Sequence, residues 1–155
     1  MDIEVKVKLT RGAPLPAYAT EGSAALDLRA ALQGGSITIP AGGRALIPTG
    51  VSISPQNAAS SEPDAGVVAI VAARSGLAIK HGITLSNGIG VIDSDYRGEI
   101  MVGLTNTSDC SFVIRDGDRV AQLMFVPVLR ARLVEADTLD STQRGAGGFG
   151  STGIK

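Results

Sequence analysis

The stretch ITLSNGIGVIDSDYRG, residues 83–98, decides the fold class, because two extended apolar segments flank the short sequence SNG. Asn87 and Gly88 both tolerate a positive φ, and such a pair between two apolar runs is a signal for a β-hairpin. The stretch therefore predicts two strands joined by a tight turn.

The same stretch gathers charge in a chain that is otherwise rich in small and aliphatic residues. Asp93 and Asp95 stand beside Tyr96 and Arg97, directly after the apolar segment GVI. A carboxylate in this place is either the solvated end of a strand or a base held at the floor of a pocket. These residues alone leave both interpretations open.

Short β-segments recur along the rest of the chain. Residues 3–9 alternate apolar and charged side chains, which is the period-two pattern of a half-buried strand. Further segments of this kind lie at residues 25–30, 36–39, 44–53, 67–73, 99–105, 111–114 and 119–136. Clusters of Gly, Pro, Asn and Asp separate them, so the pattern predicts an all-β sandwich, jelly roll or barrel with very little helix.

Three segments depart from the strand pattern. Residues 75–82 predict one or two helical turns, with Ser75 as the N-cap and Gly82 as the stop. Residues 54–66 are polar and contain two prolines, which predicts an exposed loop. Residues 144–155 are rich in glycine and offer little to bury, which predicts a flexible C-terminal tail.

Composition limits the class of protein. A chain of 155 residues is long enough for one domain, expected here over residues 1–143. The net charge of −1 lacks the basic surplus that binding to a nucleic-acid backbone requires. Cys110 and His81 are the sole residues of their types, which excludes an intrachain disulfide and a four-ligand His/Cys zinc site.

The N-terminus and the apolar runs bear on location. The first ten residues alternate charged and apolar side chains, unlike a signal peptide. The longest apolar run, residues 67–73, is far shorter than a membrane span of about 20 residues. We expect a cytoplasmic protein that does not enter a membrane.

Two motifs offer ligands for an anion. In ARSG, residues 73–76, Arg74 emerges from an apolar strand, and Ser75 with the next two N–H groups could seat a phosphate. A surface arginine followed by an ordinary cap is the alternative. Asp27 and Gln122 each lie within an apolar strand segment, where either could also be an outward-facing polar residue.

The C-terminal tail formally matches a dinucleotide-binding pattern with its glycines Gly145, Gly147 and Gly150. Too few residues follow for the helix which that fold requires, so the match is rejected. The glycines can nevertheless let backbone N–H groups converge on an anion beside Arg144. Phe149 indicates that the tail covers something flat.

The open edge of the predicted hairpin at residues 83–98 suits a nucleobase. Uracil displays acceptor, donor and acceptor along its pairing edge, and free backbone N–H and C=O groups complement that order. A uracil-reading edge, a carboxylate and phosphate ligands would together make a nucleotide site.

Five blocks in this order resemble the homotrimeric dUTPase family. They are ALDLRA (25–30), ARSGLA (73–78), SNGIGVIDSDYRG (86–98), RVAQLMF (119–125) and RGAGGFGSTG (144–153). The resemblance implies a jelly-roll-like β fold, a homotrimer with shared active sites, and Mg²⁺-dependent hydrolysis of dUTP to dUMP and pyrophosphate. It also implies that the reaction supplies dUMP for thymidylate synthesis and keeps uracil out of DNA.

The resemblance assigns roles to individual residues. Asp93 would be the general base that activates water for attack on the α-phosphorus, and Asp27 would reach Mg²⁺ through water. Tyr96 would pack against deoxyribose and exclude a 2′-hydroxyl. The other uracil-binding residues would be Asn87, Val91, Ile92, Met101 and Phe149. The phosphate-binding residues would be Arg74, Ser75, Gly76, Gln122, Arg144, Gly150 and Ser151.

Two alternatives stay open at this point. A dCTP deaminase of the same superfamily is the competing enzyme, although Asp93, Tyr96 and the glycine-rich tail fit the hydrolase pattern. A regulatory module that senses nucleotide and docks a protein partner is the competing binding function, with residues 54–66 as its candidate surface. Ala73 stands where many relatives have proline, which could loosen the strand end before Arg74.

Overall fold

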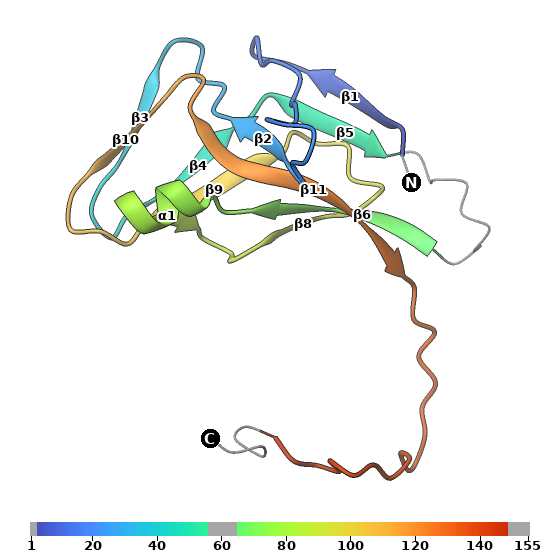
Figure 1. Cartoon of the computed structure of the whole chain (residues 1–155). Coiled ribbons are helices and arrows are strands. Elements are labelled where there is room, and N and C mark those ends of the chain that lie inside the picture. Colours follow the sequence, from blue (N-terminus) through green and yellow to red (C-terminus); the bar gives the residue numbers. More distant parts are fainter. Residues whose placement is uncertain (1–2, 56–64, 149–155) are drawn as a thin grey trace.

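A computed structural model describes residues 3–55 and 65–148, and its regular secondary structure consists of antiparallel strands and one short helix (Figure 1). The larger sheet has the order β2 (Leu26–Arg29), β11 (Arg119–Leu129), β6 (Ala65–Ala72) and β8 (Gly90–Ile92). The smaller sheet has the order β4 (Arg44–Pro48), β9 (Met101–Asn106) and β7 (Ile83–Leu85). Two further pairs are β1 (Val5–Leu9) with β5 (Val51–Pro55), and β3 (Ser36–Ile39) with β10 (Phe112–Arg115). The all-β prediction is confirmed.

The core lies between these sheets and draws residues from all of them. Alternation along the strands builds this core. Strand β5 shows it most clearly, because its residues alternate between buried and half-buried along its whole length. In β9 the alternate residues Val102, Leu104 and Asn106 are buried, while Met101 at its start is exposed. Period-two patterning therefore assigns one face of each strand to the core and leaves the other face for function.

The predicted hairpin at residues 83–98 is wrong, although both of its strands exist. Strand β7 pairs with β9 in the smaller sheet, whereas β8 pairs with β6 in the larger one. Gly88 has a φ of +74°, as a tight turn requires, but the turn carries the chain from the smaller sheet to the larger one. Turn chemistry reports where a chain bends and does not determine which partner the next strand will find. As a result, β8 lies at the edge of its sheet.

The segment 44–53, expected as one strand, is divided between two sheets. Strand β4 ends at Pro48, and β5 begins at Val51. Gly50 between them has a φ of +68°, and a Cβ atom there would lie 2.5 Å from the carbonyl oxygen of Thr10. Only glycine fits this bend, which lets β4 pair with β9 and β5 pair with β1.

The short helix α1 (Ser75–His81) is present, with a different start from the one predicted. Its N-cap is Arg74, which makes no side-chain capping bond, so Ser75 is the first helical residue and not the cap. Gly82 ends the helix as predicted, with a φ of 67° and a backbone N–H bonded to the carbonyl of Ala78. Within the described ranges, no helix has the length and apolar character needed to cross a bilayer.

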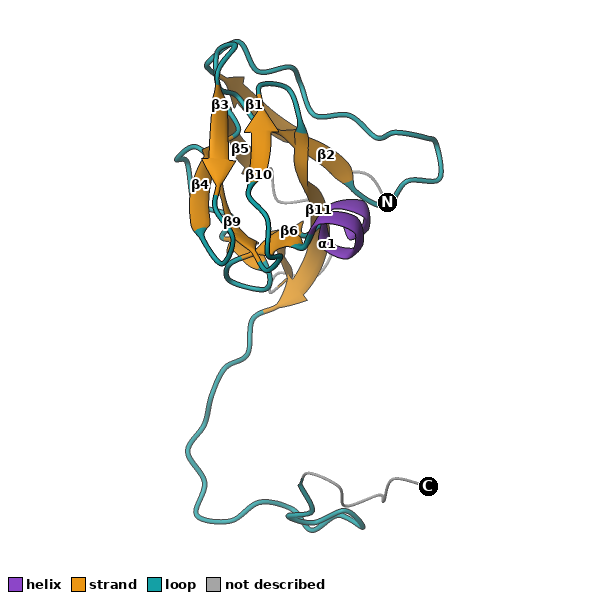
Figure 2. Ribbon diagram, turned by 90° about the vertical axis from the view of Figure 1, so that its left-hand side faces the viewer, coloured by secondary structure: helices purple, strands orange, loops and turns teal. Residues whose placement is uncertain are grey.

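The boundaries of the expected loop and tail shift. Ser54 and Pro55 belong to β5, and β6 begins at Ala65, so both ends of the expected 54–66 loop are strand. Strand β11 ends at Leu129 instead of continuing to residue 136, and residues 130–148 contain no strand or helix. Figures 1 and 2 both show this segment leaving the body of the domain. The last strand therefore ends at Leu129, well before residue 143, the predicted end of the domain.

Candidate functional site

A cavity of about 200 Å³ opens beside the edge strand β8. Apolar groups form much of its wall, and Asp93 and Glu99 supply carboxylates. We call it the β8 cavity. Its lining residues are Val91, Ile92, Asp93, Tyr96, Glu99, Ile100 and Met101. Five predicted site residues thus lie together. They are the predicted general base Asp93 and four residues predicted to bind uracil or deoxyribose, Val91, Ile92, Tyr96 and Met101.

Short-range contacts hold the turn that carries Asp93. The backbone N–H of Tyr96 donates to the carbonyl oxygen of Asp93 at 3.1 Å. The guanidinium of Arg97 donates to the carbonyl oxygens of Ser94 at 2.7 Å and Tyr96 at 3.0 Å. The exposed carboxylate of Asp93 therefore sits on a turn whose backbone shape is fixed by its own residues.

Glu99 anchors the end of this turn to the rest of the fold. Its carboxylate accepts a hydrogen bond from the backbone N–H of Gly50 at 2.7 Å and pairs with Arg11 at 3.1 Å. Its carbonyl oxygen accepts a bond from the phenol of Tyr96 at 3.1 Å. Sequence reasoning missed Glu99 and Arg11, because 88 residues separate the two members of this ion pair.

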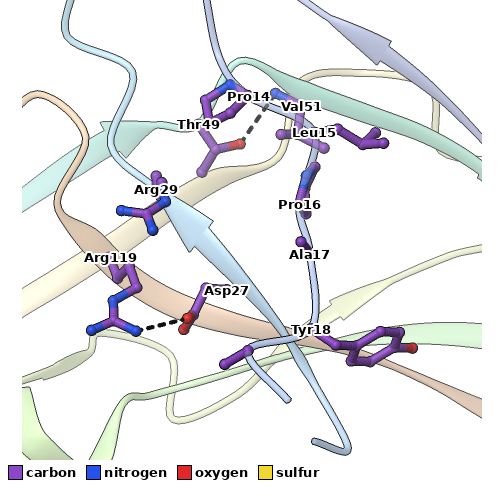
Figure 3. A pocket seen from close by; sticks show the side chains of 11 residues that line it. Pro14, Leu15, Pro16, Ala17, Tyr18, Asp27, Arg29, Thr49, Val51 and Arg119 are labelled. Atoms are coloured by element: carbon purple, nitrogen blue, oxygen red, sulfur yellow. Dashed lines mark hydrogen bonds and ion pairs between the residues drawn. The ribbon is translucent and has the colours of Figure 1, made fainter. Parts of the chain in front are cut away.

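A second polar group, the Asp27 cluster, forms on the larger sheet and comprises Asp27, Arg74, Arg119 and Gln122. Asp27 pairs with Arg74 Nε at 3.3 Å and with Arg119 Nη1 at 3.2 Å. The side chain of Asp27 is only 15% exposed, and two cations compensate its burial. Figure 3 shows Arg119 and Asp27 pointing toward one another at the wall of a larger pocket of about 340 Å³.

Strand register explains why these residues share a face. Gln122 in β11 lies between Asp27 in β2 and Ala72 in β6, and directly opposed residues of antiparallel strands project to the same side. Arg74 follows Ala72 by two positions and so emerges on that side as well. Gln122 is half-buried between the buried residues Ala121 and Leu123, so its side chain faces away from the core, and it lies beside Asp27 on that face.

Arg119 joins this cluster because of a β-bulge that no sequence pattern announced. Between Arg119 and Ala121 the pairing with β2 shifts by one residue. Val120 and Ala121 are both buried, so the alternation is broken at this point. Without the bulge Arg119 would face the core, and with it the side chain reaches Asp27.

The β8 cavity and the Asp27 cluster lie at opposite ends of the β6–β8 pair. Asp93 follows Ile92, whose partner in β6 is Ala69, while Arg74 lies beyond the other end of β6. At about 3.3 Å per residue, this register separates Asp93 from Arg74 by about 15–20 Å. One chain therefore does not bring the predicted carboxylate base and the predicted phosphate ligands together.

The remaining predicted residues are scattered. Asn87 is exposed in the turn before β8, and Ser75 and Gly76 are exposed in the first turn of α1 beside Arg74. Arg144 lies in the segment that leaves the domain, where its Nε donates to the carbonyl oxygen of Gly147 at 3.0 Å. Three predicted residues, Phe149, Gly150 and Ser151, lie outside the described residues.

The donor set for Mg²⁺ is sparse. Among residues 3–55 and 65–148, no three His, Cys, Asp or Glu side chains gather closely enough to hold a metal ion. Asp27 is the carboxylate of the Asp27 cluster, and its oxygens already contact two arginines. This donor set fits an ion that takes most of its oxygen ligands from water and from a bound triphosphate, as Mg²⁺ does.

Comparison with known proteins gives one consistent result. The model of the dUTPase family matches residues 11–153. The deoxyuridine 5'-triphosphate nucleotidohydrolase of Desulfitobacterium hafniense (strain DSM 10664 / DCB-2) is 52% identical over 155 residues, which cover 98% of this chain and 97% of that relative.

Solved structures agree on the fold. The dUTPase of Staphylococcus bacteriophage 80alpha with dUPNHPP has a TM-score of 0.83 at 24% identity, covering 97% of this chain and 99% of that one. A mutant dUTPase from phage phi11 of S. aureus, whose structure reveals the coordination of a structural Mg(II) ion, has a TM-score of 0.74 at 21% identity, covering 89% of this chain and 99% of that one. The predicted jelly-roll-like β fold is thereby confirmed.

Proposed function

Because the chain belongs to the dUTPase family, and is therefore an enzyme that hydrolyses dUTP to dUMP, we propose that Asp93 is the base which activates the attacking water. The observation that carries this proposal is the position of Asp93 on a fixed turn at the wall of the β8 cavity. A carboxylate held there can orient a water molecule without moving itself. The family assignment also favours the hydrolase over the dCTP deaminase that the sequence left as an alternative.

In the proposed reaction, Asp93 accepts a proton from water as the water oxygen attacks the α-phosphorus. The bond from the α-phosphorus to the bridging oxygen breaks, and pyrophosphate leaves with that oxygen and its electron pair. Such phosphoryl chemistry depends mainly on positioning and on neutralising charge. A carboxylate that is held in position is therefore adequate for it.

The β8 cavity would hold the nucleoside. One edge of β8 pairs with β6, and β8 ends its sheet, so its other edge is available to hydrogen-bond uracil through Val91 and Ile92. Met101 would line the base pocket and Tyr96 would lie against deoxyribose. Asn87 would approach the base from the preceding turn, and Phe149 would stack on it.

The Asp27 cluster would hold the triphosphate. Arg74 and Arg119 supply positive charge, Gln122 supplies an amide, and the first turn of α1 offers the backbone N–H groups at Ser75 and Gly76. The tail residues Arg144, Gly150 and Ser151 would close over the terminal phosphate. When bound, Mg²⁺ would neutralise and orient the phosphate oxygens, with Asp27 reaching its shell through water.

We further propose that the site is completed in a homotrimer. The separation of about 15–20 Å between Asp93 and Arg74 within one chain is too large for a single dUTP to use both as described. A ring of three copies can place the β8 cavity of one copy against the Asp27 cluster of its neighbour. In the cell, the reaction would supply dUMP for thymidylate synthesis and keep uracil out of DNA, and the cytoplasmic location stays a prediction.

Product analysis with four nucleotides tests the reaction. The purified protein is incubated with Mg²⁺ and dUTP, dCTP, dTTP or UTP, while pyrophosphate and ammonia are followed. Pyrophosphate from dUTP alone is expected. Ammonia from dCTP would instead identify a deaminase, and silence with every nucleotide would favour the regulatory module.

Complementation tests the shared site. Asp93→Asn and Arg74→Ala are each expected to abolish activity, and the two variants are then unfolded, mixed in equal amounts and refolded together. If each site takes these two residues from different copies, about a quarter of the sites in the mixture regain both, and activity returns to about that fraction of wild type. A mixture that stays inactive would show that one chain supplies both residues.

A further inference from the structure

Gly98 lies against the phenolic end of the Tyr96 side chain. A Cβ atom built on Gly98 would lie 2.3 Å from the phenolic oxygen of Tyr96, 2.5 Å from Cζ and 3.1 Å from Cε2. The φ of Gly98 lies outside the left-handed region, so backbone conformation does not demand glycine here. The requirement is space, because the aromatic ring occupies the volume that any other side chain would fill.

Tyr96 is also held by two hydrogen bonds, one at its backbone and one at its phenol. At the backbone, the N–H of Tyr96 donates to the carbonyl oxygen of Asp93. At the far end, the phenol donates to the carbonyl oxygen of Glu99, and the Glu99 carboxylate is itself held by the backbone N–H of Gly50 at 2.7 Å. Tyr96 is therefore folded back over the chain that follows it, with the end of its ring against Gly98, and it also lines the β8 cavity.

We infer that Gly98 is a specificity-determining residue, which lets the Tyr96 ring lie flat enough to admit a 2′-deoxyribose and leave no room for a ribose 2′-hydroxyl. The inference rests on the proposed function, in which Tyr96 contacts the sugar. Gly98 itself touches no substrate and acts through the ring. The ligand class that it selects is the 2′-deoxynucleoside triphosphate over the ribonucleoside triphosphate.

The physical reason is that a flat wall rejects a hydroxyl by its position. An apolar surface alone discriminates against an added hydroxyl by only about 100-fold, and any gap of the size of that group removes the clash. In Gly98→Ala, the atoms that meet the new methyl group belong to the far end of the Tyr96 side chain, which can rotate away. The substitution should therefore move the ring while the backbone keeps its shape.

The decisive experiment compares dUTP with UTP in matched glycine variants. In Gly98→Ala, the ratio of kcat/KM for dUTP to kcat/KM for UTP is expected to fall about tenfold, mainly because KM for UTP decreases. The kcat for dUTP should stay within about threefold, since Asp93 keeps its place. Gly22→Ala is the control, because Gly22 is exposed, has an ordinary φ and has no atom within 4 Å of its built Cβ.

A double variant shows whether Gly98 acts through the ring. In a Tyr96→Ala background, Gly98→Ala should cause no further change in the dUTP to UTP ratio, because the ring that it displaces is gone. An equal fall in both backgrounds would overturn the inference. So would a folded Gly98→Ala enzyme whose ratio stays within about twofold of wild type.

The remaining outcomes are also informative. If Gly98→Ala fails to fold while the double variant folds, the clash with Tyr96 is real and the inference is supported. If both fail to fold, Gly98 supports the backbone instead, and the inference is overturned. If the wild-type protein releases no pyrophosphate from dUTP, the proposed function is refuted. If the wild type is active and Gly98→Ala keeps the same preference for dUTP over UTP, only the inference about Gly98 is overturned.

Discussion

The β8 cavity and the Asp27 cluster are built in opposite ways. Around the cavity, the turn from Asp93 to Arg97 is shaped by hydrogen bonds between residues no more than three positions apart. In the cluster, Asp27 and Arg119 meet across 92 positions of sequence, through strand register and a bulge. One half of the site is thus specified locally and the other by the fold, so the two should respond differently to substitution.

The largest effect is expected from Asp93→Asn. The amide keeps the shape of the side chain, and the bond from Tyr96 to the Asp93 carbonyl is a backbone bond, so the turn should persist. Loss of the base should lower kcat for dUTP about 10³-fold, while affinity for a non-hydrolysable dUTP analogue changes less than about threefold. Steady-state kinetics and calorimetry measure the two quantities.

Asp95→Asn is the matched control, since Asp95 is an exposed carboxylate on the same turn. It should retain most of the activity. An equal loss in both variants would mean that charge on the turn matters and that Asp93 has no special role as a base.

The next effect is expected from Arg119→Ala, which breaks the cluster that depends on the fold. Asp27 keeps its pair with Arg74, so the sheet should survive, but the cluster loses one of its two cations and one of the two groups that fix the Asp27 carboxylate. We expect kcat/KM for dUTP to fall about 10- to 30-fold, with a much smaller change in dUMP affinity, because dUMP lacks the β- and γ-phosphates and its nucleoside would be held by the β8 cavity. Arg44→Ala, at an exposed arginine in β4, is the control. A matching loss of dUMP affinity would contradict the division into two halves.

The same contrast explains how far sequence reasoning reached. Asp93 and Tyr96 belong to one short motif, so the sequence alone placed them together, whereas Met101 was added by the resemblance to a family; all three line the β8 cavity. Asp27 and Gln122 could each be noticed in a strand, but only the resemblance to a family joined them to Arg74. Strand partners that depend on the whole sheet stayed out of reach.

Arg119 and the hairpin show the physical limit most clearly. Alternation predicts that a residue two positions from Ala121 shares its face, and the bulge at Val120 reverses that outcome. The turn at Gly88 was recognised, yet β7 and β8 enter different sheets. A bend and a shifted register both depend on competing long-range pairings, which no short window contains.

A smaller effect is expected from Glu99→Ala, which removes the side-chain tie from the cavity to Gly50 and Arg11. The Glu99 side chain is 22% exposed, and its loss leaves the N–H of Gly50 without this acceptor. The free energy of unfolding should decrease by about 1–2 kcal/mol. Urea denaturation measures it, with Glu135→Ala, in the segment outside the domain, as control. An unchanged midpoint would mean that the local bonds of the turn suffice by themselves.

The smallest effect concerns Asp116, a carboxylate held by backbone groups instead of arginines. The N–H of Leu32 donates to it at 2.7 Å and the N–H of Gly34 at 2.9 Å, and these bonds hold the pKa of the Asp116 carboxyl below its ordinary value of 3.8. Because the folded pKa is the lower one, the contribution to stability is complete above the unfolded value, near pH 4, and is lost as pH falls through the folded value.

Thermal unfolding between about pH 2 and pH 6 should therefore show a steeper acid decline for wild type than for Asp116→Asn, which has no proton to take up at this position. Asp137→Asn, an exposed carboxylate outside the domain, should follow the wild-type curve. Parallel curves for all three proteins would mean that the two backbone bonds form equally well with a neutral side chain. The negative charge of a carboxylate that binds distant parts of the chain would then contribute to stability where its partners are arginines, as at Asp27, and not where its partners are backbone N–H groups, as at Asp116.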